Sequence, residues 1–548
     1  MKQALLQRLA GRTWLGIAAA TGISLVAGAA AVQGEPRTSV QPYLEVQQVA
    51  TMDFDRGEVL TYTGVGGGID ASVSTRRVQA TISYNYQRRI GWNERIEDHD
   101  VHSGLAAVHV EAVPGVLSLD AGAMAARSHA DIRVPVPAAR TINSADVAEI
   151  YSAYVGPTLT THAGPVSVGA SYRLGYVRVD DDSLAGSGLP PGAPRVERYS
   201  SSTVHNASVS LGMAPGRLPF GWTVGAGYVR EDMNRFNSRF EGQYVRGDVV
   251  VPVSPTLAVT GGVGYESMQG SQQDFRRGPG GVPVLTPRGD LIPDPSRPRL
   301  ETLDQDGIMW DAGILWRPSR RTELQARGGW RYGGESFTAS LSHKINSRSS
   351  LNASIYDSVS SFGRLLIADL NGLPTKFQTP RNGDLGGLSG AGCVFGNDPG
   401  TGACFGDALQ SIANFNFRNR GASLRYSAAR GPWSMGLGAG YANRKYLAPS
   451  DNVFALNGVT DQSFSLEGNL GRRLTRSSGY DFDAYASWYD SGLAGSDSSF
   501  GAGLTGRYYR NIFRDRLQAQ IAAGLYTTQA GEFDASYGSL LLGLRYNF

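Results

Sequence analysis

The sequence contains little cysteine, little lysine and little charge. Only two of its 548 residues are cysteine, so the chain can form one internal disulfide at most. Lysine occurs four times, and arginine therefore supplies nearly all of the positive charge. Charged residues make up 18% of the chain and the formal net charge is +3, which is too small to indicate a nucleic-acid partner.

Long hydrophobic runs are missing after the first 31 residues. No later stretch of about 18 apolar residues exists, which excludes a membrane-spanning helix. Near the start, three basic residues precede an apolar stretch from Trp14 to Ala31 that ends in three alanines. We interpret residues 1–31 as a signal peptide that is removed on export, with a retained membrane anchor as the alternative. Residues 32–41 are predicted to be a short periplasmic segment.

No helical period and no interdomain linker are evident in the remainder, which contains many of the 71 glycines and 25 tyrosines. Apolar and polar residues alternate instead, as in residues 78–87, 323–332 and 480–489, and aromatic residues lie toward the ends of the apolar faces. Alternation over about ten residues is typical of transmembrane β-strands. A soluble β-sandwich would also alternate, but would not place aromatic residues at both rims of so many strands.

The connections between these segments are alternately short and long. The long ones are residues 129–148, 178–201, 267–304, 360–411 and 447–460. This pattern predicts short periplasmic turns and long extracellular loops. We predict an all-β protein in the bacterial outer membrane: one large transmembrane antiparallel β-barrel over residues 42–548, with about 22 strands, or 20 if one hairpin is miscounted. We expect loops 267–304 and 360–411 to cover or plug its mouth.

The chain ends in SYGSLLLGLRYNF, which alternates up to the final residue. In a closed barrel the last strand pairs with the first, so this ending is predicted to be the closing strand. It also resembles the C-terminal assembly signal of bacterial outer-membrane proteins, in which a final Phe follows an aromatic residue two positions earlier. Tyr546 and Phe548 match that pattern, and the resemblance implies recognition by the barrel-assembly machinery.

The polar faces of the predicted strands are rich in arginine, carboxylates and tyrosine. The candidate lumen-lining residues are Arg89, Glu323, Arg327, Arg331, Arg425, Arg444, Asp481, Asp483, Tyr485, Arg507 and Arg545. Arginine presents a planar fork to carboxylates and phosphates, and tyrosine stacks on sugar rings, so this wall suits an anionic saccharide. The alternative is that any wide, hydrated lumen is lined by polar groups that partly pair with one another.

Signals for chemistry are weak. Gly501, Gly503 and Gly506 have dinucleotide-loop spacing, but the residues after them continue a strand. No nucleophile motif of a hydrolase and no zinc-protease motif occurs, so we predict no enzyme activity, no cofactor and no metal. Cys393 and Cys404 are predicted to form a disulfide that restrains a long loop, with two free thiols as the alternative.

Two stretches carry a family resemblance: QPYLEVQQVATMDF from residue 41, and LTYTGVGGGIDASVSTRRVQATISYNYQRRI from residue 60. They resemble the outer-membrane β-barrels associated with exopolysaccharide loci, including those beside PEP-CTERM sorting systems. The resemblance implies a non-catalytic conduit for exopolysaccharide export or surface assembly. Its expected partners are exopolysaccharide, periplasmic export components, outer-membrane lipid and lipopolysaccharide. We expect a monomer that binds no nucleic acid.

Other barrel classes remain as alternatives or fit less well. A general diffusion porin is the first alternative, since residues 360–411 are long enough to fold inward. A structural or adhesive surface barrel is the second. TonB-dependent receptors have 22 strands but need a plug domain ahead of the barrel, for which a first strand near residue 42 leaves no room.

Overall fold

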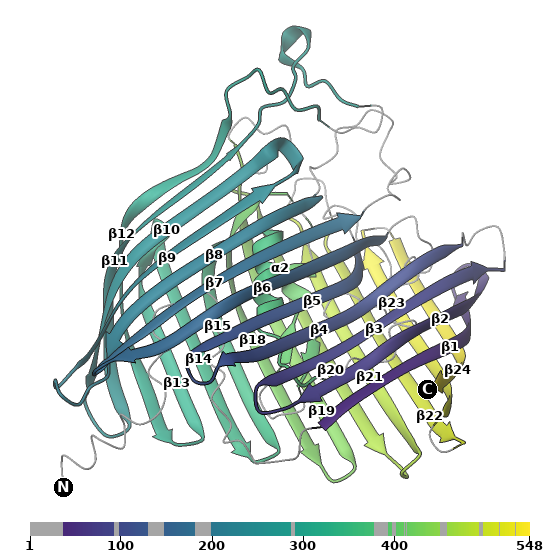
Figure 1. Ribbon diagram of the computed structural model, residues 1–548. Helices are drawn as coiled ribbons and strands as arrows, with labels where there is room; N and C mark the ends of the chain where they lie inside the picture. The colour runs from purple at the N-terminus through teal and green to yellow at the C-terminus, as the bar shows by residue number, and fades with distance from the viewer. Residues whose placement is uncertain are drawn as a thin grey trace.

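The computed structural model in Figure 1 describes most of the chain. The described residues are 37–92, 98–129, 147–180, 199–286, 291–377, 393–396, 402–409, 412, 414–449, 457–492, 497–513, 516–531 and 533–548. The predicted signal peptide, residues 1–31, and residues 32–36 of the predicted segment 32–41 lie outside them, whereas residues 37–41 belong to the first strand.

Twenty-two antiparallel strands form one closed barrel. Their bounds are β1 (Arg37–Asp53), β2 (Val59–Ser74), β3 (Val78–Gly91), β4 (His99–Val113), β5 (Leu117–His129), β6 (Val147–Ala163), β7 (Val166–Asp180), β8 (Ser201–Met213), β9 (Gly221–Met233), β10 (Ser238–Pro252), β11 (Leu257–Gln272), β12 (Leu300–Ser319), β13 (Thr322–Arg331), β14 (Gly334–Asn346), β15 (Ser349–Ser360), β18 (Asn416–Arg430), β19 (Trp433–Leu447), β20 (Thr460–Arg473), β21 (Ser478–Asp490), β22 (Ser499–Ile512), β23 (Leu517–Ala530) and β24 (Phe533–Asn547). The predicted 22-stranded barrel is confirmed, although its first strand begins at Arg37 and not at residue 42.

The ring closes between the two ends of the chain. Strand β24 pairs with β1 from Tyr43 opposite Asn547 to Asp53 opposite Tyr537. The amide of Phe548 donates to the carbonyl of Pro42 at 3.1 Å, which extends the pairing beyond the last strand residue. Closure leaves no sheet edge exposed, as a bilayer requires.

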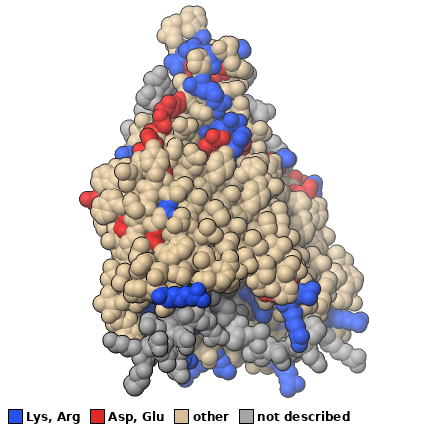
Figure 2. Space-filling view, turned by 60° about the vertical axis from the view of Figure 1, so that its left-hand side comes forward, with Lys and Arg blue, Asp and Glu red and all other residues tan. Residues whose placement is uncertain are grey.

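Side chains alternate between an apolar outer face and a polar inner face. On β24, Leu540, Leu542 and Leu544 are 46–53% exposed on the outside. Leu541, on the opposite face, is 4% exposed and packs with Val49. A broad, nearly uncharged band crosses the face shown in Figure 2. Apolar residues facing lipid around a polar interior place this barrel in the outer membrane.

The two ends of the barrel differ in the length of their connections. Short turns, such as residues 75–77 and 431–432, lie at the end that we assign to the periplasm. The longer connections lie at the opposite, external end. The described residues contain no helix that is long and apolar enough to span a membrane.

The connection between β11 and β12, residues 273–299, projects away from the barrel, at the top of Figure 1. We call it the projecting hairpin. It includes a 3₁₀ turn, Pro279–Gly281, and isolated bridges such as Phe275 to Pro293. At its base Phe275 and Leu291 pack on Phe236, which lies in the 3₁₀ turn Arg235–Asn237. The expectation that loop 267–304 covers the mouth is therefore wrong, because residues up to Gln272 and from Leu300 extend the strands and the rest points outward.

We call the connection between β15 and β18 the inner loop. Its described residues, 361–377, 393–396, 402–409, 412 and 414–415, lie inside the barrel. It contains helix α2 (Phe362–Asn371), the short strands β16 (Cys393–Phe395) and β17 (Gly402–Cys404), and helix α4 (Gly406–Leu409). The absence of helix expected from the sequence is corrected here. Ser361 caps α2, since its Oγ accepts a hydrogen bond from the amide of Arg364 at 3.2 Å.

Candidate functional site

The inner loop packs against the inner wall of the barrel through α2. Leu366 and Leu370 are fully buried, and Ile367 is 6% exposed. The wall fits the helix because it carries glycine opposite the large side chains: a Cβ added to Gly175 on β7 would lie 2.8 Å from Cδ1 of Ile367. This interface belongs to the largest buried apolar cluster among the described residues. The helix is thus seated on β5 to β8.

After α2, the inner loop continues toward the periplasmic half of the lumen. Nε of Arg173 on β7 donates to Oδ1 of Asn371 at 3.2 Å. Oγ1 of Thr81 on β3 donates to the carbonyl of Thr375 at 2.7 Å. Oγ1 of Thr375 in turn donates to Oε1 of Gln79 at 3.1 Å. Gln79 lies one residue from the start of β3 at a periplasmic turn, so the loop descends from the external rim across the lumen.

A buried ion pair fixes the external end of the inner loop. Nε of Arg364 lies 3.1 Å from Oε2 of Glu231 on β9, and their side chains are 8% and 0% exposed. Nη2 of Arg364 donates to Oδ1 of Asn416 at 2.7 Å, and the guanidinium lies 3.6 Å above the ring of Phe240. Burial lowers the pKa of Arg364, whereas Glu231 acts in the opposite direction, so the group stays charged. We call Arg364 and Glu231 the latch pair.

The latch pair is supported by its neighbours. The hydroxyl of Ser361 donates to Oε2 of Glu231, so the residue that caps α2 also contacts the carboxylate. Tyr199 is buried against Phe362, with ring centroids 4.9 Å apart, and burial raises the pKa of its phenol well above the usual value. The start of α2 is therefore held by polar and aromatic contacts from three strands and one external connection.

The second fixed point of the inner loop is a hairpin formed by β16 and β17. Cys393 and Cys404 pair across it and form a disulfide. The amide of Cys393 donates to Oε2 of Glu467 on β20 at 2.7 Å, and Nη1 of Arg425 on β18 donates to the carbonyl of Gly402. A Cβ at Gly438 on β19 would lie 2.8 Å from Sγ of Cys393, so glycine admits the hairpin to the wall. Arg425 is the predicted lumen residue that contacts the inner loop directly.

Four charges form a compact cluster on the wall from β10 to β13. Arg246 lies 2.7 Å from Asp248 and 2.6 Å from Asp311. Arg327 lies 2.7 Å from Asp248 and 3.1 Å from Asp311. Two guanidinium groups and two carboxylates thus compensate one another. Arg331 is likewise compensated, by Glu266 at 2.8 Å.

The remaining predicted lumen residues are distributed around the ring and form no single site. Arg507 pairs with Asp481, Arg545 lies 2.6 Å from Asp70, and Glu323 pairs with Arg317 at 3.0 Å. Arg89 stacks 5.0 Å from the ring centre of Tyr62, and Arg444 stacks 5.0 Å from that of Phe417. The backbone carbonyl of Asp483 accepts from Thr505 at 3.5 Å, and Tyr485 packs on Tyr526. Most of these arginines are thus held by carboxylates or aromatic rings of the wall itself.

Sequence patterns did not identify the residues that fix the inner loop. Glu231, Arg364 and Asn416 carry no motif, and they come from three separate parts of the chain. The signal that was present is the spacing of Phe362, Leu366 and Leu370 after Ser361, which suits a capped amphipathic helix. The two residues of the predicted assembly signal lie elsewhere, on the outer face: Tyr546 and Phe548 are 41% and 68% exposed, with ring centroids 5.2 Å apart.

No protein-family model and no curated protein matches this chain. Solved structures of similar fold include the FrpB iron transporter of Neisseria meningitidis (F5-1 variant, apoprotein), with 12% identity and a TM-score of 0.45 over 92% of this chain and 81% of that one. The ferric-catecholate import receptor Fiu of E. coli K12, closed form, has 11% identity and a TM-score of 0.44 over 94% and 82%. The alcaligin receptor FauA of Bordetella pertussis has 12% identity and a TM-score of 0.38 over 92% and 76%. The likeness concerns the fold.

The prediction of an exopolysaccharide conduit is corrected by these findings. The three structures named above are described as an iron transporter, a ferric-catecholate import receptor and an alcaligin receptor. The described parts of the inner loop also occupy two separate parts of the inner wall, on β5 to β8 and on β18 to β20, where a polymer would need a continuous path.

Proposed function

We propose that this outer-membrane transport barrel takes up a small polar ligand from the external side, and that the inner loop closes the path until it is displaced. The observation that carries the proposal is the course of the inner loop from the latch pair at the external rim to Thr375 near the periplasmic end. A loop with this course blocks the path through the barrel as long as no ligand is bound.

Two features distinguish this arrangement from a loop that only narrows a pore. The inner loop is held at separate points of the wall, by the latch pair and by the disulfide hairpin, and both involve buried polar contacts. Breaking a buried ion pair costs several kcal/mol, roughly 3–5, when one partner is left alone. Opening therefore requires an input, and binding of a ligand at the external side is the simplest one, since both ends of the loop lie at that rim.

The charge balance of the wall bears on the ligand. The cluster of Arg246, Asp248, Asp311 and Arg327 has no net charge, and Arg331, Arg507 and Arg545 each pair with a carboxylate. A polyanion would need a track of uncompensated positive charge. A small polar ligand suits this wall better than a polyanion does, because it can exchange a few hydrogen bonds at a time with the paired side chains.

Deleting the inner loop tests the proposal. Ser360 on β15 is paired with Phe417 on β18, so a short Gly-Ser linker can replace residues 362–414 without straining the ring. We expect the wild-type protein to show rare or small current steps in a planar bilayer. The variant should show large, long-lived steps, since barrels of only about 16–18 strands already enclose an aqueous channel.

The matched control shortens the projecting hairpin. Gln272 pairs with Leu300, so residues 275–297 can be replaced by a similar linker. This variant should conduct like the wild type, because the hairpin points away from the lumen. Heat-modifiable mobility on a gel verifies that both barrels are folded. Wild-type steps as large as those of the inner-loop deletion would refute the closed resting state.

A further inference from the structure

Exposed arginines follow one another along the periplasmic edge of the barrel. Arg430, Arg473, Arg476, Arg510 and Arg516 lie in or next to the successive turns from β18 to β23, and all five are exposed. None of their side chains forms an ion pair within the described part of the chain. Figure 2 shows Lys and Arg side chains projecting from the lower edge of another face of the barrel. This edge lies at the level of the inner-leaflet headgroups.

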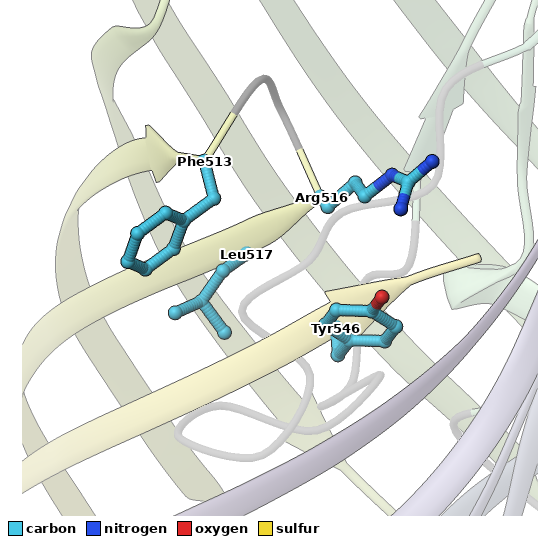
Figure 3. A pocket seen from close by; sticks show the side chains of 4 residues that line it. All are labelled: Phe513, Arg516, Leu517 and Tyr546. Carbon is cyan, nitrogen blue, oxygen red and sulfur yellow. The ribbon is translucent and has the colours of Figure 1, made fainter.

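A cavity of about 550 Å³ lies at this edge, between β22, β23 and β24. Its lining residues are Phe513, Arg516, Leu517 and Tyr546. In Figure 3 the side chains of Phe513 and Leu517 lie on one side of the turn, and the guanidinium of Arg516 extends to the other, above Tyr546. Arg514 and Asp515, between them in the chain, lie outside the described residues.

The apolar part of this cavity faces the membrane and not the lumen. Leu517 is directly opposite Tyr546 on β24 and opposite Ile512 on β22, so the three share one face of the sheet. That face is the outer one, since Tyr546 is 41% exposed and Ile512 38%. Phe513, with 73% exposure, extends the apolar surface past the end of β22.

A second arginine lies on the same outer face, one row deeper into the membrane. Arg510 is opposite Ala519, and this pair lies two residues along the strands from the pair of Ile512 and Leu517. Because side chains two residues apart point to the same face of a strand, Arg510 also faces outward. A cation at this depth is costly in hydrocarbon unless its side chain extends to the headgroup layer. An anionic headgroup at the edge would compensate Arg510 and Arg516 together.

We propose that this cavity is a binding site for an anionic glycerophospholipid of the inner leaflet, such as phosphatidylglycerol. Its phosphate would contact Arg516, its glycerol and first acyl carbons would contact Phe513, Leu517 and Tyr546, and Arg510 on the neighbouring strand would add positive charge beside the same headgroup. Basic pockets beside an apolar membrane face recognise anionic lipids in this way. An acidic periplasmic protein would use the arginines but not the apolar, lipid-facing wall, so the geometry favours the lipid. The site does not depend on the proposed uptake.

Native mass spectrometry of the detergent-solubilised full-length protein tests the site. With equimolar phosphatidylglycerol and phosphatidylethanolamine, the wild type should retain phosphatidylglycerol preferentially. The double variant R510Q/R516Q should bind it about 25-fold more weakly, at about fivefold per arginine. The matched control is R217Q, which removes an exposed arginine from the turn between β8 and β9, on another part of the ring.

Competition with soluble glycerol phosphate distinguishes a site that binds a whole lipid from a site that binds any phosphate. It should not displace phosphatidylglycerol from the wild type at equal concentration, and F513S should weaken lipid retention while both arginines remain. Equal retention of the two lipids, unchanged retention in R510Q/R516Q, an equal loss in R217Q, or displacement by glycerol phosphate would each overturn the proposal.

Discussion

Replacing Glu231 by glutamine should open the closed barrel. The substitution preserves the shape of the side chain but leaves the buried guanidinium of Arg364 without a counter-charge. The cost of stranding a buried charge is about 3–5 kcal/mol, and it falls on the closed state, since displacement of the inner loop exposes Arg364 to water. We expect the ratio of open to closed barrels in planar bilayers to rise by about 10²–10⁴-fold.

A second substitution separates the loss of charge pairing from general damage. In E231Q/R364M both charges are absent and a long apolar side chain occupies the space beside Phe240, which lies 3.6 Å from the guanidinium in the wild type. Because the double variant leaves no buried charge without a partner, it should close nearly as well as the wild type. If E231Q alone gated like the wild type, the latch pair would not hold the loop.

Replacing Phe548 by serine should sharply reduce the amount of barrel in the outer membrane. The substitution removes a side chain that is 68% exposed to the membrane edge and stacks edge-on with Tyr546. Loss of the aromatic pair with Tyr546 removes roughly 0.5–1.5 kcal/mol from the closing strand. If the assembly machinery reads this ending, its affinity for the chain falls too. The measurement is the level of folded, heat-modifiable protein in outer-membrane fractions.

Phe513 provides the control for Phe548. It is 73% exposed at the same periplasmic edge but is not part of the chain ending, so F513S removes similar apolar area without touching the closing strand. Outer-membrane levels of F513S should stay close to those of the wild type. Equal reductions in both variants would assign the effect to lost apolar surface, and a normal level of F548S would contradict a role for the ending in assembly.

The wall of the barrel follows from local sequence, whereas the direction of its loops does not. Alternation with period two fixes which residues face lipid, because a shift by one residue would move Leu540, Leu542 and Leu544 to the inside. Even Leu541, the exception to that alternation, is explained by position, since it packs on Val49 across the closing seam. Closure itself follows from the bilayer, which tolerates no free sheet edge.

The two longest loops show the limit of this reasoning. Both are rich in glycine and proline, and neither composition predicts that one projects and the other folds inward. The inner loop is held by Glu231, 133 residues before Arg364, and by Gly175, whose missing side chain matters only once Ile367 lies against it. Long-range pairs such as Arg545 with Asp70, 475 residues apart, exist only after the ring has closed.

The projecting hairpin is packed on the barrel independently of the inner loop. Its base packs through Phe275 and Leu291 on Phe236, in a cluster distinct from the one that seats α2. Among the described residues, those of the projecting hairpin extend far from the barrel on its external side (Figure 1). Substitutions in its outer residues should therefore leave the cluster that seats α2 unchanged.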